Sequence, residues 1–122
     1  MTSEFASASR GSRDLEVLSS DGTKLFAQEF GPGRDAPLLV FSHGWACQGR
    51  FWRPQVEQFA ATHRVVVYDQ RGHGASRGRP EPEDYRFEQA ANDLLRVLDA
   101  AGLDEPIDFA GSSLGAAAAL HA

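Results

Sequence analysis

The chain has 122 residues, of which 12 are basic and 17 acidic, giving a formal net charge of −5. Its length suits one domain, and a hydrophobic fraction of 42% is ordinary for a globular fold. Lys24 is the only lysine and the arginines are scattered, so no basic stripe predicts nucleic acid as a partner. Cys47 is the only cysteine, which excludes an intrachain disulfide.

The N-terminal residues 1–12 are rich in Ser, Ala and Gly, and they lack the continuous apolar core of a signal peptide. We expect them to form a flexible tail in front of a domain at 13–122. No apolar run approaches membrane-spanning length, so no membrane partner is predicted. These observations together favour a soluble, cytoplasmic protein.

The first two predicted strands form an antiparallel hairpin. Leu15–Leu18 and Lys24–Phe30 flank a segment that contains Asp21-Gly22, a strong turn signal. The Gly- and Pro-rich residues 31–37 then interrupt the pattern.

Beyond this break, apolar strands alternate with helices. Continuous apolar runs at 38–41 and 65–68 predict parallel strands that are covered on both faces, and a shorter run at 107–110 predicts a third. Helices are predicted at 51–61, at 87–101 with Gly102 as the C-terminal cap, and from 115 onward. The second helix carries one apolar stripe: Phe87, Ala91, Leu94, Leu95, Leu98 and Ala101. The alternation predicts an α/β fold with a mostly parallel sheet and flanking helices.

The residues that suggest chemistry begin with Gly111-Ser112-Ser113-Leu114-Gly115, a G-x-S-x-G motif between a predicted strand and a predicted helix. In this context the serine stands on a sharp turn and acts as a nucleophile, and the flanking glycines leave room that a Cβ would fill. The alternative is that Ser113 is an ordinary helix N-cap.

A second motif, His43-Gly44-Trp45, follows the first parallel strand. A loop here places the backbone N–H of Trp45 where an acyl oxyanion develops, and the N–H of Leu114, after the nucleophile, gives a second donor. We interpret the His43 side chain as structural, with its ring bonded to the local backbone, rather than as a catalytic group.

A third motif, at 68–76, reads YDQRGHGAS after the second parallel strand. Asp69 and His73 are candidates for a catalytic triad, but two residues so close in one loop more often hold its shape. We therefore interpret the loop as scaffold. Cys47 is interpreted as a small buried hydrophobe rather than a reactive thiol.

These three motifs, in this order and spacing, resemble the N-terminal half of an α/β-hydrolase fold protein, over residues 14–122. The resemblance implies that Ser113 is the nucleophile and that Trp45 and Leu114 supply the oxyanion hole. A serine favours acyl transfer over the dehalogenase and epoxide hydrolase branches, which use aspartate. The implied function is a serine hydrolase for carboxylic esters or related small-molecule acyl substrates, without metal or organic cofactor.

Two features depart from the family pattern. Ser112 stands where many relatives carry histidine, and the family's catalytic acid and base lie in the second half of the fold. His121 is the only histidine after Ser113, and eight helical residues put it about 12 Å along the axis, too far to take the serine's proton. We therefore expect these 122 residues alone to have little or no esterase activity. A ligand-binding or signalling module and a non-catalytic fragment remain the alternatives, with substrate and oligomeric state open.

Overall fold

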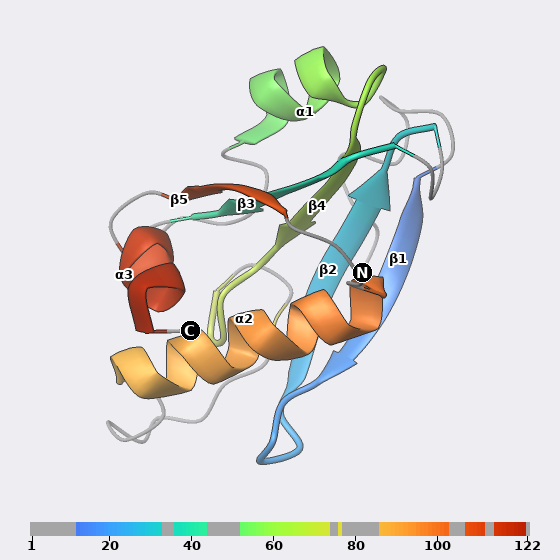
Figure 1. The fold of residues 1–122 in the computed structure, drawn as a ribbon. Helices are drawn as coiled ribbons and strands as arrows, with labels where there is room; N and C mark the ends of the chain where they lie inside the picture. The colour runs from blue at the N-terminus through green and yellow to red at the C-terminus, as the bar shows by residue number, and fades with distance from the viewer. Residues whose placement is uncertain are drawn as a thin grey trace.

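The computed structural model describes residues 12–32, 36–43, 52–73, 76, 86–102, 107–111 and 114–121. These residues form a five-stranded sheet with helices on both faces (Figure 1). The strands are β1 (Arg13–Leu18), β2 (Lys24–Phe30), β3 (Leu38–Ser42), β4 (Arg64–Tyr68) and β5 (Asp108–Gly111). The helices are α1 (Arg53–Phe59), α2 (Phe87–Ala101) and α3 (Leu114–His121). Every element lies where the apolar patterns predict it, with its ends displaced by a few residues at most.

The sheet has the strand order β1-β2-β4-β3-β5. β2 pairs antiparallel with both β1 and β4, whereas β3 pairs parallel with both β4 and β5. Of the five described strands, only β2 therefore runs against the others. This arrangement confirms the predicted α/β fold, a mostly parallel sheet that begins with an antiparallel hairpin.

The hairpin turn between β1 and β2 is closed by backbone hydrogen bonds. Ser19 N donates to Thr23 O and Gly22 N donates to Ser19 O, each over 2.9 Å. Gly22 has a φ of 83°, the left-handed conformation that glycine adopts without strain. The N–H of Thr23 also donates to Asp21 Oδ1 over 3.0 Å, which fixes the acidic side chain in the turn.

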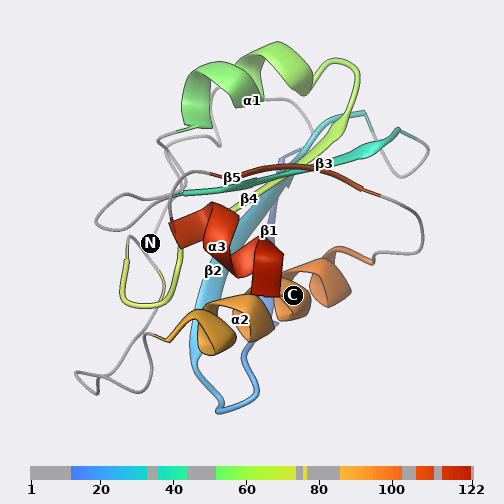
Figure 2. The same cartoon turned by 60° about the vertical axis from the view of Figure 1, so that its left-hand side comes forward.

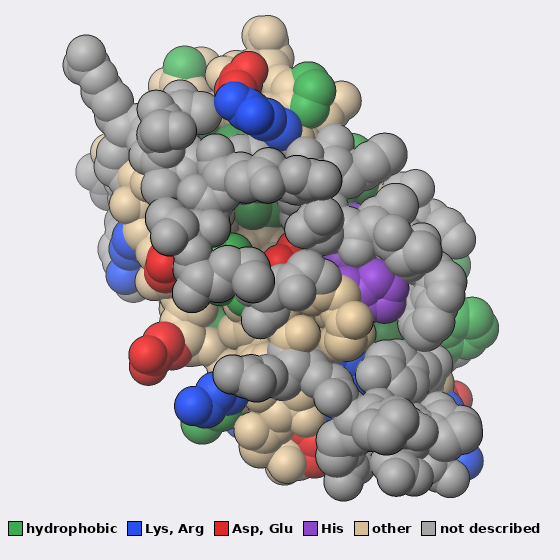
Figure 3. Space-filling model, turned by 180° about the vertical axis from the view of Figure 1, so that it is seen from behind, with side chains coloured by type: hydrophobic (Ala, Val, Ile, Leu, Met, Phe, Trp, Pro, Cys, Tyr) green, Lys and Arg blue, Asp and Glu red, His purple; other side chains and the backbone are tan. Residues whose placement is uncertain are grey.

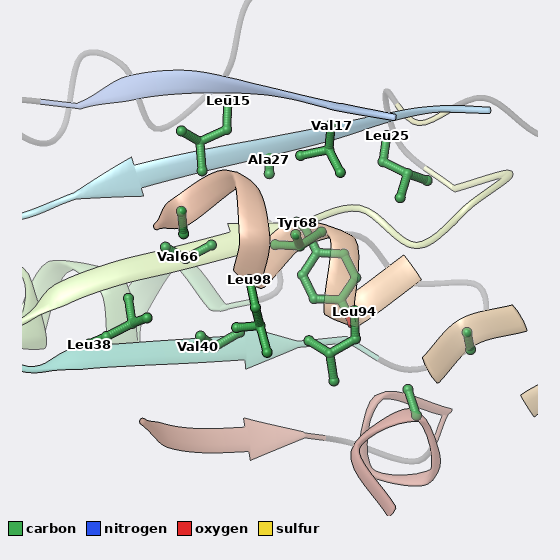
Figure 4. Packing of buried hydrophobic residues seen from close by; sticks show 14 residues of the cluster. Leu15, Val17, Leu25, Ala27, Leu38, Val40, Val66, Tyr68, Leu94 and Leu98 are labelled. Atoms are coloured by element: carbon green, nitrogen blue, oxygen red, sulfur yellow. The ribbon is translucent and has the colours of Figure 1, made fainter. Parts of the chain in front are cut away.

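Two apolar layers cover the sheet, because β3 and β4 bury alternate side chains on opposite faces. One layer lies between the sheet, α2 and α3, and Tyr68 reaches into it from β4 toward Leu94 of α2 (Figure 4). The other contains Phe30, Phe41 and Val56, and lies under α1. Figures 1 and 2 show α1 on one face of the sheet and α2 and α3 on the other. Burial on both faces explains the continuous apolar runs of the central strands.

The buried face of α2 differs from the predicted stripe. Phe87 and Leu95 are 51% and 45% exposed, so their assignment to the stripe is wrong. The helix instead buries Asp93 and Val97, which an apolar stripe centred on the leucines does not include. Gly102 ends the helix, which confirms the predicted C-terminal cap, and its φ of 75° and ψ of 49° are left-handed.

The surface carries both signs of charge. On the face seen in Figure 3, basic and acidic side chains of the described residues are interspersed rather than gathered by sign. None of the described helices has the length and apolar character needed to cross a bilayer. The predicted tail lies outside the described residues except at its last position.

Candidate active site

The G-x-S-x-G segment spans the end of β5 and the start of α3. β5 ends at Gly111 and α3 begins at Leu114, so only Ser112 and Ser113 join strand to helix. Gly111 pairs with Ser42, the last residue of β3, which brings this connection to the carboxyl end of the parallel strands. Ser113 and Trp45 themselves lie outside the described residues, whereas the Leu114 backbone opens α3. The structure thus places a strand and a helix two residues apart on either side of the G-x-S-x-G serines.

Gly115, the last glycine of the G-x-S-x-G motif, lies where there is no room for a side chain. A Cβ added there would lie 2.2 Å from the carbonyl oxygen of Ser42 and 2.6 Å from Ser42 Oγ. Side-chain carbons do not approach backbone this closely, so any other residue would push α3 away from β3. The close approach sets the first turn of α3 directly against the end of β3.

His43 follows β3 and is fully buried. Its ring Nε2 accepts a hydrogen bond from the backbone N–H of Gln70 over 2.7 Å. Because Nε2 is the acceptor, the ring proton of this neutral imidazole resides on Nδ1. This confirms a structural role for the His43 ring, although its partner lies in the loop after β4 and not in the local backbone.

Three further polar side chains meet at His43. The hydroxyls of Ser42 and Tyr68 share a hydrogen bond of 2.7 Å, and Gln70 Nε2 donates to Ser42 Oγ over 3.1 Å and to the His43 carbonyl over 3.3 Å. Burial raises the pKa of Tyr68 far above its ordinary value, so its hydroxyl stays protonated. We call Ser42, His43, Tyr68 and Gln70 the polar quartet.

Sequence reasoning missed the polar quartet as a unit. The available signal is its position, because all four residues come at or directly after the ends of the apolar runs that form β3 and β4. Only the parallel pairing of Ser42 with Tyr68 brings the two halves together.

Hydrogen bonds to backbone atoms hold the loop after β4 in place. Asp69 N donates to Phe26 O over 2.9 Å, and the Asp69 carbonyl accepts a hydrogen bond from Ser76 Oγ. Ser76 Oγ also accepts from Phe26 N over 2.8 Å, and His73 Nδ1 donates to the Arg71 carbonyl over 3.0 Å. These contacts support the interpretation of this loop as scaffold rather than as part of a triad.

Comparison with known proteins agrees with this geometry. The family model described as alpha/beta hydrolase fold matches residues 37–122. The chain belongs to this family. A solved alpha/beta hydrolase from Novosphingobium aromaticivorans superposes with a TM-score of 0.77 at 24% identity, over 89% of this chain and 38% of that one. At this identity, the likeness supports the fold alone.

Two curated relatives show the range of hydrolase chemistry near this sequence. A 3-oxoadipate enol-lactonase 1 of Acinetobacter baylyi is 36% identical over 87% of this chain and 38% of its own length. An epoxide hydrolase B of Mycobacterium tuberculosis is 34% identical over 73% of this chain and 26% of its own length. The α/β-hydrolase chain therefore spans about a third of the length of the curated relatives it matches.

Arg71 anchors the scaffold loop of this α/β-hydrolase. Its guanidinium donates twice to Asp93 of α2, from Nε to Oδ2 over 2.8 Å and from Nη2 to Oδ1 over 3.0 Å. It also donates to Asp21 Oδ2 in the hairpin turn, over 2.8 Å. This hydrogen bond is the main cause that lowers the pKa of Asp21. Arg71 thus ties three segments together, which explains why α2 buries Asp93.

The described residues offer no group of three or more His, Cys, Asp or Glu side chains placed to hold a metal ion.

Proposed function

We propose that these residues are the nucleophile-bearing part of a serine hydrolase that acts on carboxylic esters or related acyl substrates. The observation that carries the proposal is the two-residue connection between β5 and α3, with Gly115 packed against Ser42. This is the setting in which the serine of a G-x-S-x-G motif is presented as a nucleophile.

In the proposed reaction, Ser113 Oγ attacks the acyl carbon while a base removes its proton. The negative charge on the acyl oxygen is stabilised by the N–H groups of Leu114 and Trp45. The acyl C–O bond then breaks, the protonated base gives its proton to the leaving oxygen so that the alcohol departs, and water hydrolyses the acyl-enzyme to release the acid and restore the Ser113 hydroxyl. Leu114 is the first residue of α3, where backbone N–H groups have no partner within the helix.

The base is expected to come from outside these 122 residues. His43 already accepts a backbone hydrogen bond at Nε2, and His121 ends α3, about 10 Å along the axis from its start. The 122 residues alone should therefore turn over esters poorly.

The serine decides between acyl transfer and other hydrolytic chemistry. The relatives include a lactonase and an epoxide hydrolase, so similarity alone does not select the reaction. By family resemblance, a serine at position 113 favours an acyl-enzyme, because the epoxide hydrolase branch uses aspartate there.

A serine-directed fluorophosphonate tests the proposal on the protein expressed from its natural reading frame. We expect stoichiometric labelling that Ser113→Ala abolishes. The matched control is Ser112→Ala, which removes a hydroxyl group from the adjacent serine. The labelling rate of this variant should stay within a few-fold of wild type. Absence of labelling, or labelling that survives Ser113→Ala, would refute the proposal.

A further inference from the structure

The polar quartet consists of four polar side chains that are buried in the interior of the protein. Ser42, His43, Tyr68 and Gln70 are at most 2% exposed, although the remainder of β3 and β4 is mostly Val, Leu and Phe. Burying polar groups opposes folding unless each finds a partner, and here the hydrogen bonds supply the partners. Such a network is directional, so it fixes positions more narrowly than apolar packing does.

Its location is equally specific. The quartet joins the ends of β3 and β4, at the edge of a parallel sheet where ligand sites form in such folds. Ser42 belongs to the quartet, and its carbonyl and Oγ are also the atoms that leave no room for a Cβ on Gly115. The quartet therefore contacts the first turn of α3.

Gln70 holds His43 from two sides. Its backbone N–H donates to the His43 ring over 2.7 Å, and its side-chain Nε2 donates to the His43 carbonyl over 3.3 Å. The same Nε2 reaches Ser42 Oγ over 3.1 Å. One residue of the β4 loop thus fixes both the side chain and the main chain at the point where β3 ends.

We propose that Gln70 is a positioning residue for oxyanion stabilisation. It fixes the main chain at His43, two residues before Trp45, relative to Ser42 at the end of β3. The start of α3, where Leu114 lies, packs against the same end of β3. This inference rests on the proposed serine-hydrolase function. Gln70 contacts no reacting atom in this role, and it acts through His43 and Ser42. Oxyanion donors act by being held in place before reaction, and an error of about 1 Å can lower the rate by up to about 10²-fold.

Gln70→Met tests the inference, because Met keeps the length of the side chain and the backbone N–H but loses the amide. Gln28→Met is the matched control: Gln28 is an equally buried glutamine, on β2, whose Nε2 donates to Asp14 Oδ1 over 2.8 Å. Both variants are compared with wild type in the protein from its natural reading frame. The measurements are the rate constant of fluorophosphonate labelling, kcat and KM for a p-nitrophenyl ester, and the melting temperature.

We expect Gln70→Met to lower the labelling rate and kcat by about tenfold or more, with KM little changed. We expect the labelling rate and kcat of Gln28→Met to stay within about twofold of wild type, even if its melting temperature falls as much as that of Gln70→Met. Equal rates for Gln70→Met and wild type, or equal losses in both variants, would overturn the inference.

Failure of the underlying function is distinguishable, because wild type itself would then not be labelled. If Gln70→Met does not fold, Ser42→Ala removes the hydroxyl to which Gln70 donates and is judged by the same results.

Discussion

Gly115 lies where the first turn of α3 contacts the end of β3. This contact predicts how one added methyl group changes the stability of the fold. In an open helix, replacing Gly by Ala stabilises by about 1 kcal/mol. Here the new Cβ would meet the Ser42 backbone at 2.2 Å, which requires α3 or β3 to move. We expect Gly115→Ala to lower the free energy of unfolding by about 1–3 kcal/mol, as measured by urea denaturation.

The matched comparison for this residue is Gly22→Ala in the hairpin turn. Nothing lies within 4 Å of a Cβ there, and only the φ of +83° opposes the change. A methyl group at position 22 should thus cost about 1–2 kcal/mol in backbone strain without affecting fluorophosphonate labelling. A stabilised Gly115→Ala variant would show that α3 does not press on β3 as described.

At the scale of elements, the sequence predicts most of what is observed, because continuous apolar runs and turn residues act locally. The two-residue connection between β5 and α3 is predictable for the same reason. The buried face of α2 is not, since Asp93 faces inward to meet Arg71, a partner 22 residues away. The polar quartet is missed for a similar reason, because Gln70 reaches His43 only once β3 and β4 are in register.

The Arg71 contacts predict how strongly α2 is anchored. Asp93 and Arg71 side chains are 1% and 4% exposed, so Asp93→Ala leaves a buried guanidinium without its main carboxylate. We expect a loss of about 3–5 kcal/mol in the free energy of unfolding by urea denaturation. Glu57→Ala is the control: it breaks an ion pair with Arg53 in which both side chains are about half exposed, and should cost no more than about 0.5 kcal/mol. Similar losses in the two variants would contradict a buried anchor.

For the whole molecule, acid sensitivity follows from carboxylates that tie the N-terminal hairpin to the rest of the sheet. Burial alone would raise the pKa of Glu29, but hydrogen bonds and charges from Arg64 and Arg13 lower it overall. Arg71 lowers the pKa of Asp21 in the same way. A carboxyl whose pKa is lowered by folding takes up its proton first in the unfolded chain. Its stabilisation is therefore present above pH of about 4 and is lost as the pH falls further.

Glu29→Gln tests this acid sensitivity, because Gln keeps the shape and one acceptor but not the charge opposite Arg64, which lies 2.7 Å from Glu29 Oε1. At pH 7 the variant should be about 1–3 kcal/mol less stable than wild type. The gap should narrow as the pH is lowered from 5 to 3, since Glu29 of the unfolded wild-type chain then takes up a proton that the folded protein binds only at lower pH. Chemical denaturation at each pH measures both curves, with Glu57→Gln as the exposed control that should stay within about 0.5 kcal/mol of wild type throughout. A gap that widens on acidification would mean that the Glu29 carboxylate does not stabilise the fold through Arg64.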